Sequence, residues 1–314
     1  MQKLHEWYKL NGRHDLPWRQ THDAYKIWIS EIMLQQTQVK TVLERYYFPF
    51  LEKFPTLEHL ANASIDEVLK AWEGLGYYTR ARNLHKSAQI CQVELPKTAK
   101  ELEKLAGIGQ STAHAIACFA YGEALPILDA NVKRILQRYF ALREAKPKEL
   151  WEYSYKLFDP DNAYDFNQAM MDIGATLCTP KNPNCNQCPF ESECQGKDEP
   201  HLYPTKKPTK AKPTKTPYIV IYKKGDQFAL FQSDKRLLGG LWGFAQEEKR
   251  PSKAKKIGEV SHHYSHFALK CEVLLCNGVI KHNRWFSIDE INELALSGLD
   301  RKVLALIRNC TNGG

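Results

Sequence analysis

The chain has 314 residues, 43% hydrophobic and 25% charged, which is typical of a folded globular protein and excludes a disordered one. No run reaches the roughly 18 consecutive apolar residues of a membrane-spanning helix, and the first residues lack a signal-peptide pattern. We therefore expect a cytoplasmic, nucleoid-associated location without membrane contact. The formal net charge of +8 favours a polyanionic partner such as nucleic acid, with a merely basic surface as the alternative.

The predicted elements divide the chain into three stretches. Residues 1–200 are predicted to be an all-α domain, because apolar residues recur at helical spacing and capping signals such as Ser64 with Glu67 begin the helices. Residues 201–217 contain four prolines and five lysines, which predict an extended basic linker. Residues 218–314 alternate short apolar runs with turns and end in a helical tail, so we expect a smaller α+β domain there.

Two turns in the helical domain pair glycines around one apolar residue, at 74–76 and 107–109. Such glycine pairs permit a tight turn with positive φ, and after Gly109 a new helix begins at once. Its first backbone amides are free to bind a DNA phosphate without regard to base sequence. A plain helical hairpin with a glycine cap is the alternative reading of Gly107 and Gly109.

Four of the nine cysteines fall within 17 residues. The odd total and the absence of a secretion signal argue against a disulfide framework. Structural zinc sites usually combine two Cys-x-x-Cys knuckles or cysteine with histidine, and here there is a single knuckle. The spacing therefore favours an iron–sulfur cluster over zinc, which stays the alternative. The predicted ligands of this [4Fe–4S] cluster are Cys178, Cys185, Cys188 and Cys194.

Several motifs in the same order resemble the endonuclease III superfamily of DNA glycosylases, a helix-hairpin-helix family. These motifs are the hairpin at 107–109, the aspartate at position 129 and the cysteine spacing. Within the superfamily the chain resembles the adenine glycosylase branch, the MutY proteins, over nearly its whole length. The segments that carry this closer resemblance are 16–19, 30–39, 74–84, 166–172 and 239–244.

The resemblance implies a monofunctional enzyme of base excision repair that flips out and removes adenine paired with 8-oxoguanine, or more weakly with guanine, in duplex DNA. Lyase members of the superfamily carry a Schiff-base lysine where this chain has Ser111, so no amine nucleophile is available there. A pyrimidine-damage glycosylase and a non-catalytic DNA-binding protein with a cluster are the alternatives. We expect a monomer.

Two carboxylates are the catalytic candidates, because base removal needs a proton donor for the base and a stabiliser for the sugar cation. Glu31 lies in an apolar helical segment, where burial would raise its pKa. Asp129 precedes a predicted helix whose dipole favours a charged carboxylate. The simpler readings are that Asp129 is only a helix N-cap and that Glu31 is a partly exposed helix residue. The resemblance implies that Glu31 protonates adenine at N7 and that Asp129 stabilises the sugar cation or bonds to it.

The resemblance also implies two sets of residues that contact the substrate. The adenine pocket would comprise Trp18, Arg19, Leu34, Ser111, Asn131 and Gln168. The residues that contact the DNA and the lesion would be Gln36, Tyr77, Gly107, Gly109, Ser265 and His266.

Residues 218–314 resemble the Nudix-like recognition domain of the adenine glycosylases. The loop at 262–267 matches the loop that reads 8-oxoguanine in that family. A nucleotide hydrolase would need a glutamate-rich metal helix, and the segment 246–251 has a proline and the wrong spacing for one. We therefore expect this domain to read the lesion; catalysis on nucleotides by this half of the chain is the rival interpretation.

Overall fold

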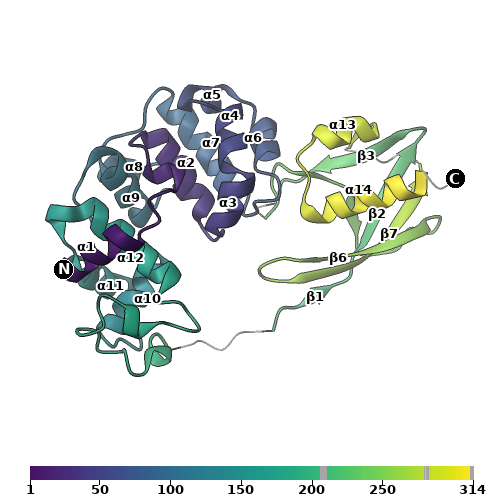
Figure 1. Ribbon diagram of the computed structural model, residues 1–314. Helices are drawn as coiled ribbons and strands as arrows, with labels where there is room; N and C mark the ends of the chain where they lie inside the picture. The colour runs from purple at the N-terminus through teal and green to yellow at the C-terminus, as the bar shows by residue number, and fades with distance from the viewer. Residues whose placement is uncertain (206–210, 236, 279, 281–282, 312–314) are drawn as a thin grey trace. The chain divides into compact units, whose positions relative to one another are not determined.

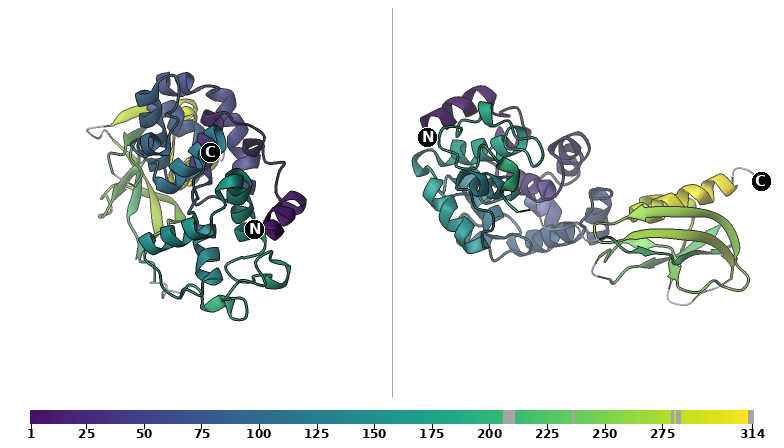
Figure 2. Two further views of the ribbon diagram at one scale, coloured as in Figure 1. Left: turned by 90° about the vertical axis from the view of Figure 1, so that its left-hand side faces the viewer. Right: turned by 90° about the horizontal axis from the view of Figure 1, so that it is seen from below.

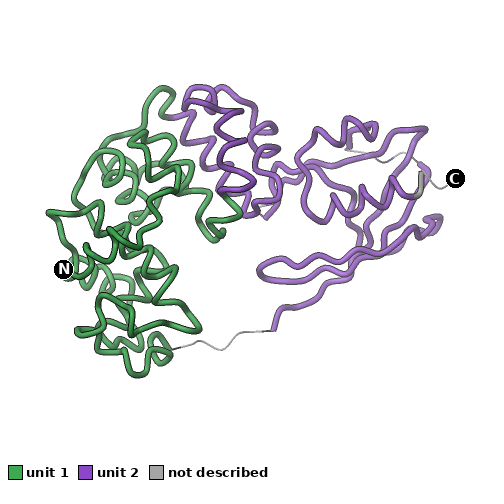
Figure 3. The backbone as a smooth tube through the Cα atoms, viewed as in Figure 1, with its two compact units in different colours: residues 1–42, 91–208 green, residues 43–90, 209–314 purple. Residues whose placement is uncertain are grey.

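The computed structural model describes most of the chain. The described residues are 1–205, 211–235, 237–278, 280 and 283–311. Contacts between Cα atoms divide them into two compact units, residues 1–42 with 91–208 and residues 43–90 with 209–314 (Figure 3). No described helix is long and apolar enough to cross a membrane.

This division differs from the predicted limits at 200 and 217, because the segment 43–90 is grouped with the C-terminal half. The limits 1–200, 201–217 and 218–314 therefore stay a prediction. Residues 206–210 of the predicted linker lie outside the described residues.

The first unit is helical, as predicted (Figures 1 and 2). Short 3-10 turns lie between its α-helices, among them η1 (Pro17–Arg19) and η3 (Cys185–Gln187). Helix α3 crosses the boundary between the two units. The α-helices are α1 (Gln2–Asn11), α2 (Ala24–Leu34), α3 (Val39–Arg45), α8 (Ala99–Leu102), α9 (Gln110–Tyr121), α10 (Ala130–Tyr139), α11 (Pro147–Leu157) and α12 (Ala163–Thr176).

Helix α12 holds the first unit together, because α1 and α10 both pack against it. Leu4 and Tyr8 of α1 join Leu136 and Phe166 in one buried apolar cluster. A Cβ atom on Gly174 would lie 2.4 Å from the Cβ of Asn131, so glycine is needed where α12 passes the first turn of α10. This close approach places the start of α10 directly against α12.

The second unit begins with four helices, α4 (Tyr47–Lys53), α5 (Leu57–Asn62), α6 (Ile65–Ala71) and α7 (Thr79–Cys91). The predicted capping box at the start of α6 is confirmed: Ser64 Oγ accepts from the Glu67 backbone N–H at 3.2 Å, and Glu67 accepts from the Ser64 N–H at 2.9 Å.

The rest of the second unit is a mixed sheet with helices, so the predicted α+β fold is confirmed. Its strands are β1 (Thr214–Lys215), β2 (Tyr218–Lys224), β3 (Gln227–Gln232), β4 (Trp242–Gly243), β5 (Ala245–Glu247), β6 (Lys255–His263), β7 (Ala268–Asn277) and β8 (Arg284–Phe286). The main strand order is β1-β7-β2-β3-β4, with β5 on β2, β6 on β7 and β8 on β3. Strands β2 and β7 are parallel, and β6 pairs with β7 antiparallel.

The expected helical tail consists of two helices, α13 (Ile288–Glu293) and α14 (Gly298–Thr311). The break has a cause in the sheet, because the Trp242 N–H donates to the Ala295 carbonyl at 2.9 Å and so draws the intervening chain into an extended form. Helix α14 then lies along one face of the sheet, where Val303 and Ile307 join the buried core (Figure 2).

Candidate active site and cysteine loop

The first unit contains a cavity of about 670 Å³, the size of a small-molecule site. Both predicted catalytic carboxylates line it, Glu31 from α2 and Asp129 from the start of α10. Gln36 lines it as well. All six residues of the predicted adenine pocket also line this cavity: Trp18, Arg19, Leu34, Ser111, Asn131 and Gln168.

Glu31 lies on a helix that is otherwise mostly buried. Trp28, Ile32 and Met33 around it are all at most 3% exposed. Burial, and to a smaller extent the Asp129 carboxylate, raise the pKa of Glu31 to about 7, although Arg19 opposes both effects. The carboxyl group can therefore carry a proton near neutral pH, as a general acid must.

Asp129 is the N-cap of α10. Its Oδ1 accepts from the Val132 backbone N–H at 2.7 Å, and its Oδ2 accepts from Asn131 Nδ2 at 3.3 Å. Burial raises the pKa of Asp129, although the hydrogen bonds from Val132 and Asn131 and the charge of Arg134 lower it. The helix start therefore favours the charged form, as expected, but burial outweighs that effect.

Ser111 supports the chain just before Asp129. Its Oγ accepts a hydrogen bond from the Leu128 backbone N–H at 3.1 Å. This contact joins the first turn of α9 to the start of α10. A serine hydroxyl at this position offers no amine for a Schiff base.

An ionic network behind the cavity was not expected from the sequence. Asp172, on α12, is fully buried and accepts hydrogen bonds from both Arg13 and Arg19. Arg19 binds it with both terminal nitrogens, at 2.7 and 2.8 Å. The sequence signal was a lone carboxylate on the apolar side of a helix that has Ala169 and Ile173 as neighbours.

Tyr164 connects two of the pocket residues. Its hydroxyl donates to the Arg19 carbonyl at 3.1 Å and is hydrogen-bonded to the Gln168 side chain. Because the Tyr164 hydroxyl donates its proton to the Arg19 carbonyl, the side-chain amide of Gln168 donates to the Tyr164 oxygen. The Oε1 atom of Gln168 is buried and, among the described residues, has no partner, so it is an acceptor available to a ligand.

Two predicted lesion-contacting residues have positive φ without being glycine, Gln36 at 58° and Tyr77 at 50°. This conformation is rare for such side chains and often marks functional sites. Tyr77 is 45% exposed, a large fraction for an aromatic side chain. Its hydroxyl lies 2.8 Å from the Oγ of Ser265, in the turn between β6 and β7. His266 is exposed in the same turn.

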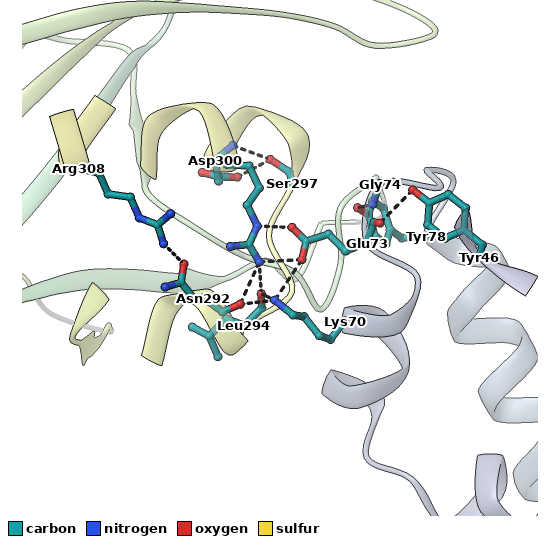
Figure 4. Close-up of polar contacts among 11 residues, drawn as sticks. Tyr46, Lys70, Glu73, Gly74, Tyr78, Asn292, Leu294, Ser297, Asp300 and Arg308 are labelled. Atoms are coloured by element: carbon teal, nitrogen blue, oxygen red, sulfur yellow. Dashed lines mark hydrogen bonds and ion pairs between the residues drawn. The ribbon is translucent and has the colours of Figure 1, made fainter. Parts of the chain in front are cut away.

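The turn before Tyr77 is held within the second unit by polar contacts (Figure 4). The Gly74 N–H donates to the Tyr78 hydroxyl at 3.1 Å. Glu73 forms a two-point ion pair with Arg301 of α14, in which Arg301 Nη2 donates to Glu73 Oε2 at 2.7 Å. The exposed Tyr77 ring therefore projects from an anchored turn.

The two glycines of the hairpin before α9 differ. Gly107 has φ of 79°, so a glycine is required there as expected. Gly109 is the N-cap of α9 with φ of −90°, which any residue can adopt, and the expectation of positive φ is wrong there. A Cβ atom on Gly109 would meet nothing within 4 Å, so the surface before the helix is open.

The four clustered cysteines line one small cavity together with Arg138. Arg138 Nη1 donates to Cys178 Sγ at 3.3 Å, and the backbone N–H groups of Phe190 and Gly196 donate to the sulfurs of Cys188 and Cys194. Hydrogen bonds to sulfur are a usual feature of iron–sulfur ligands, so the donor set fits such a cluster.

Within the described part of the chain, no group of three or more histidine, cysteine, aspartate or glutamate side chains is arranged so that it could hold a metal ion.

The segment 246–251 cannot be the first turn of a metal-binding helix, because Gln246 and Glu247 lie in strand β5. The Glu247 carboxylate accepts from the Tyr222 hydroxyl at 2.6 Å, and the Glu247 backbone pairs with Tyr218 of β2. This agrees with the expectation that the second half of the chain lacks the hydrolase helix at these residues.

Comparisons with known proteins agree with this architecture. Residues 29–160 match the HhH-GPD superfamily of base excision DNA repair proteins, and residues 218–306 match a NUDIX domain. The adenine DNA glycosylase of Buchnera aphidicola subsp. Schizaphis graminum is 36% identical, over 98% of this chain and 98% of its own length. The human adenine DNA glycosylase is 45% identical over 62% of this chain and 38% of its own length.

Among solved structures, a thermostable thymine-DNA glycosylase is 29% identical with a TM-score of 0.58, over 63% of this chain and 94% of that chain. The similarity to the bacterial relative spans both halves of the chain, which the family models match separately. The chain therefore belongs to the adenine DNA glycosylase family, whose helical half has the HhH-GPD fold of base excision DNA repair proteins.

Proposed function

We propose that this protein removes adenine paired with 8-oxoguanine, or more weakly with guanine, from duplex DNA. The observation that carries the proposal is that Glu31 and Asp129 line one cavity in different environments. Burial raises the pKa of both groups, to about 7 for Glu31, but Asp129 also accepts hydrogen bonds from the Val132 backbone and the Asn131 side chain, which favour its charged form. One group is suited to give a proton and the other to face a cation.

In this mechanism the protonated Glu31 donates to N7 of the flipped adenine, so the bond between N9 and the sugar C1′ can break with both electrons leaving on the base. Asp129 stabilises the resulting sugar cation through its charge or through a covalent bond to C1′. Water then adds at C1′ and gives up a proton, which can return to the Glu31 carboxylate, and an abasic site is left. Ser111 provides no amine to continue to strand cleavage, so the enzyme is monofunctional.

The pocket residues would bind the extruded base. Gln168 offers the buried acceptor Oε1, which suits the exocyclic amine of adenine. Trp18 is 7% exposed and supplies an apolar wall. The complementary donors and acceptors would recognise adenine by its edge.

Duplex DNA would bind through contacts outside the pocket. The open N-terminus of α9 after Gly107 and Gly109 is suited to a phosphate. Gln36 and Tyr77 would fill the space left by the extruded base, and Ser265 and His266 would read the oxidised guanine. This substrate would locate the protein at the nucleoid. We also propose a monomer with domains at 1–200 and 218–314 joined by a linker at 201–217.

A [4Fe–4S] cluster is the group that we propose for the loop 178–194, held by Cys178, Cys185, Cys188 and Cys194. When bound, it would add a redox-capable inorganic centre that cross-links this loop. Base removal is redox-neutral, so Glu31 and Asp129 need no electrons from it.

The test is single-turnover excision on duplexes with one adenine opposite 8-oxoguanine, guanine or thymine, with alkali-revealed breaks as the readout. Glu31→Gln should lose at least roughly 10²-fold in rate, as expected for a missing general acid. The matched control is Glu52→Gln, an exposed glutamate on α4, which should keep the wild-type rate.

Each outcome of this test is decisive. Excision opposite 8-oxoguanine that is lost only in Glu31→Gln supports both substrate and acid. No excision on these duplexes, together with excision on a further duplex that carries an oxidised pyrimidine, would overturn the substrate. Binding of the duplex without any excision would overturn the enzyme proposal.

A further inference from the structure

The buried carboxylate of Asp172 organises two arginines behind the cavity. Arg13 donates to it with its backbone N–H at 2.9 Å and with Nε at 2.7 Å, while Arg19 donates with Nη1 and Nη2. Burial alone would raise the pKa of Asp172, but Arg19 and Arg13 hold it below its ordinary value. Asp172 is therefore a charged group, and its two oxygens are fully engaged.

Arg19 is fixed by this contact. Its side chain is 4% exposed and lines the cavity, and its Nη1 also donates to the Arg13 carbonyl at 3.3 Å. Its Nε is buried and, within the described residues, has no hydrogen-bond partner. Asp172 thus occupies both terminal nitrogens of Arg19 and leaves Nε as the donor for a bound molecule.

The charges around Glu31 come from few side chains. Among the described residues lining the cavity, the charged groups are Arg13, Arg19, Asp129 and Glu31 itself. The residues of α9 that line it include Ser111 and Thr112, which are uncharged. With Asp172, the two arginines carry a net charge of about +1 when all three are ionised.

We propose that Asp172 is a positioning residue of the proposed glycosylase site, which holds Arg19 beside Glu31 and sets the net charge that Glu31 experiences. The proposal rests on the proposed role of Glu31 as the acid. Without Asp172 the charge of Arg19, which already favours the ionised form of Glu31, would lose the carboxylate that balances it. Without Arg13 the network would be close to neutral and favour the protonated form.

The opposite signs of these two effects provide the test. Asp172→Asn should lower the pKa of Glu31 and Arg13→Gln should raise it, each by roughly half a unit to one unit. The measurement is a pH titration of full-length protein labelled with ¹³C at the glutamate carboxyl carbons, with Glu31→Gln identifying the resonance. Asp165→Asn, an exposed carboxylate on the same helix, is the control and should leave the titration unchanged.

The pH profile of single-turnover excision is the second readout. Its alkaline limb should move to lower pH in Asp172→Asn and to higher pH in Arg13→Gln. A purely structural defect in either variant would lower the rate at every pH without moving the limb in opposite directions. Shifts of the same sign, or shifts no larger than that of Asp165→Asn, would overturn the proposal.

Two further results remain interpretable. If Asp172→Asn does not fold, Arg13→Gln decides alone, because the Arg13 side chain is 29% exposed and can be replaced at the surface. A raised pKa of Glu31 in Arg13→Gln then supports the proposal, and an unchanged pKa overturns it. If the wild type excises no adenine, the proposed function fails, and the carboxyl titration still decides whether Asp172 sets the charge at Glu31.

Discussion

Asp129 accepts the Val132 backbone N–H at 2.7 Å and thereby caps α10 with the same carboxylate that lines the cavity beside Glu31. The cap of α10 and the proposed catalytic group are therefore the same side chain. An asparagine can replace aspartate as a cap, because its carbonyl oxygen also accepts a hydrogen bond, but it carries no charge.

The two roles of Asp129 can be separated by two substitutions. Asp129→Asn should be no less stable than the wild type yet lose adenine excision, because the sugar cation has no anion to face. Asp129→Ala should lose excision and also about 1 kcal/mol of stability with the cap. Urea unfolding and single-turnover excision measure the two effects. Full excision by Asp129→Asn would leave Asp129 as a cap alone.

The raised pKa of Glu31 makes a prediction for stability. The folded-state pKa of about 7 lies above the ordinary 4.5, so the contribution of Glu31 to stability is fully present below pH 4.5 and is lost as the pH rises through 7. Glutamine does not ionise, so the Glu31→Gln variant does not lose this stability as the pH rises. At pH 8 the variant should be more stable than the wild type by roughly 1–3 kcal/mol, and at pH 4.5 the two should be similar.

Urea unfolding at the two pH values measures this difference, with Glu52→Gln as the exposed control. A difference that is the same at both values would contradict the assignment of the buried, proton-carrying group to Glu31.

The cysteine loop predicts a selective loss of iron. Cys188→Ser should purify with little iron and without the broad visible absorbance of an iron–sulfur cluster, because one ligand is missing. Cys118→Ser is the control, since Cys118 is buried on α9 and its sulfur accepts from Asn167 at 3.4 Å. It should keep its iron. Iron analysis and absorbance spectra decide, and a full iron content in Cys188→Ser would refute the ligand assignment.

The contact between Tyr77 and Ser265 predicts two different defects on DNA. Tyr77→Ala should slow excision opposite 8-oxoguanine and opposite guanine by about tenfold or more, because a stacked aromatic ring is lost. Ser265→Ala should instead reduce the preference for 8-oxoguanine over guanine. The ratio of single-turnover rates on the two duplexes distinguishes them. Tyr155→Ala, which removes another exposed aromatic, should change neither rate.

The sequence was informative where local chemistry sets the structure. The capping box at Ser64 and the strands of the C-terminal half follow from residue type and spacing, and both are confirmed. The break before α14 could not be predicted, because a contact between Trp242 and Ala295, distant in sequence, imposes it.

The candidate site shows the same contrast. Resemblance to a known family named the residues around the cavity, whereas residue type alone left two readings of Asp129 open, a helix cap and a catalytic group. Asp172 was missed because its importance comes from Arg13, which is 159 residues away in the sequence. In a sequence, a buried charged residue can be seen only as an interruption of an apolar helix face. The residues that pair with it cannot be identified from the sequence.

The packing of α1 against α12 also has a consequence for how the protein is made. His5 Nε2 lies 2.8 Å from Oδ2 of Asp159, which is 154 residues later in the sequence. Arg13 can bind Asp172 only after α12 has been synthesised. During synthesis the first helix must wait for most of the helical half to leave the ribosome, and its apolar residues Leu4 and Tyr8 stay uncovered until then. Nascent chains that end before α12 should be protease-sensitive and prone to aggregate, and resistance should arise in one step when α12 emerges.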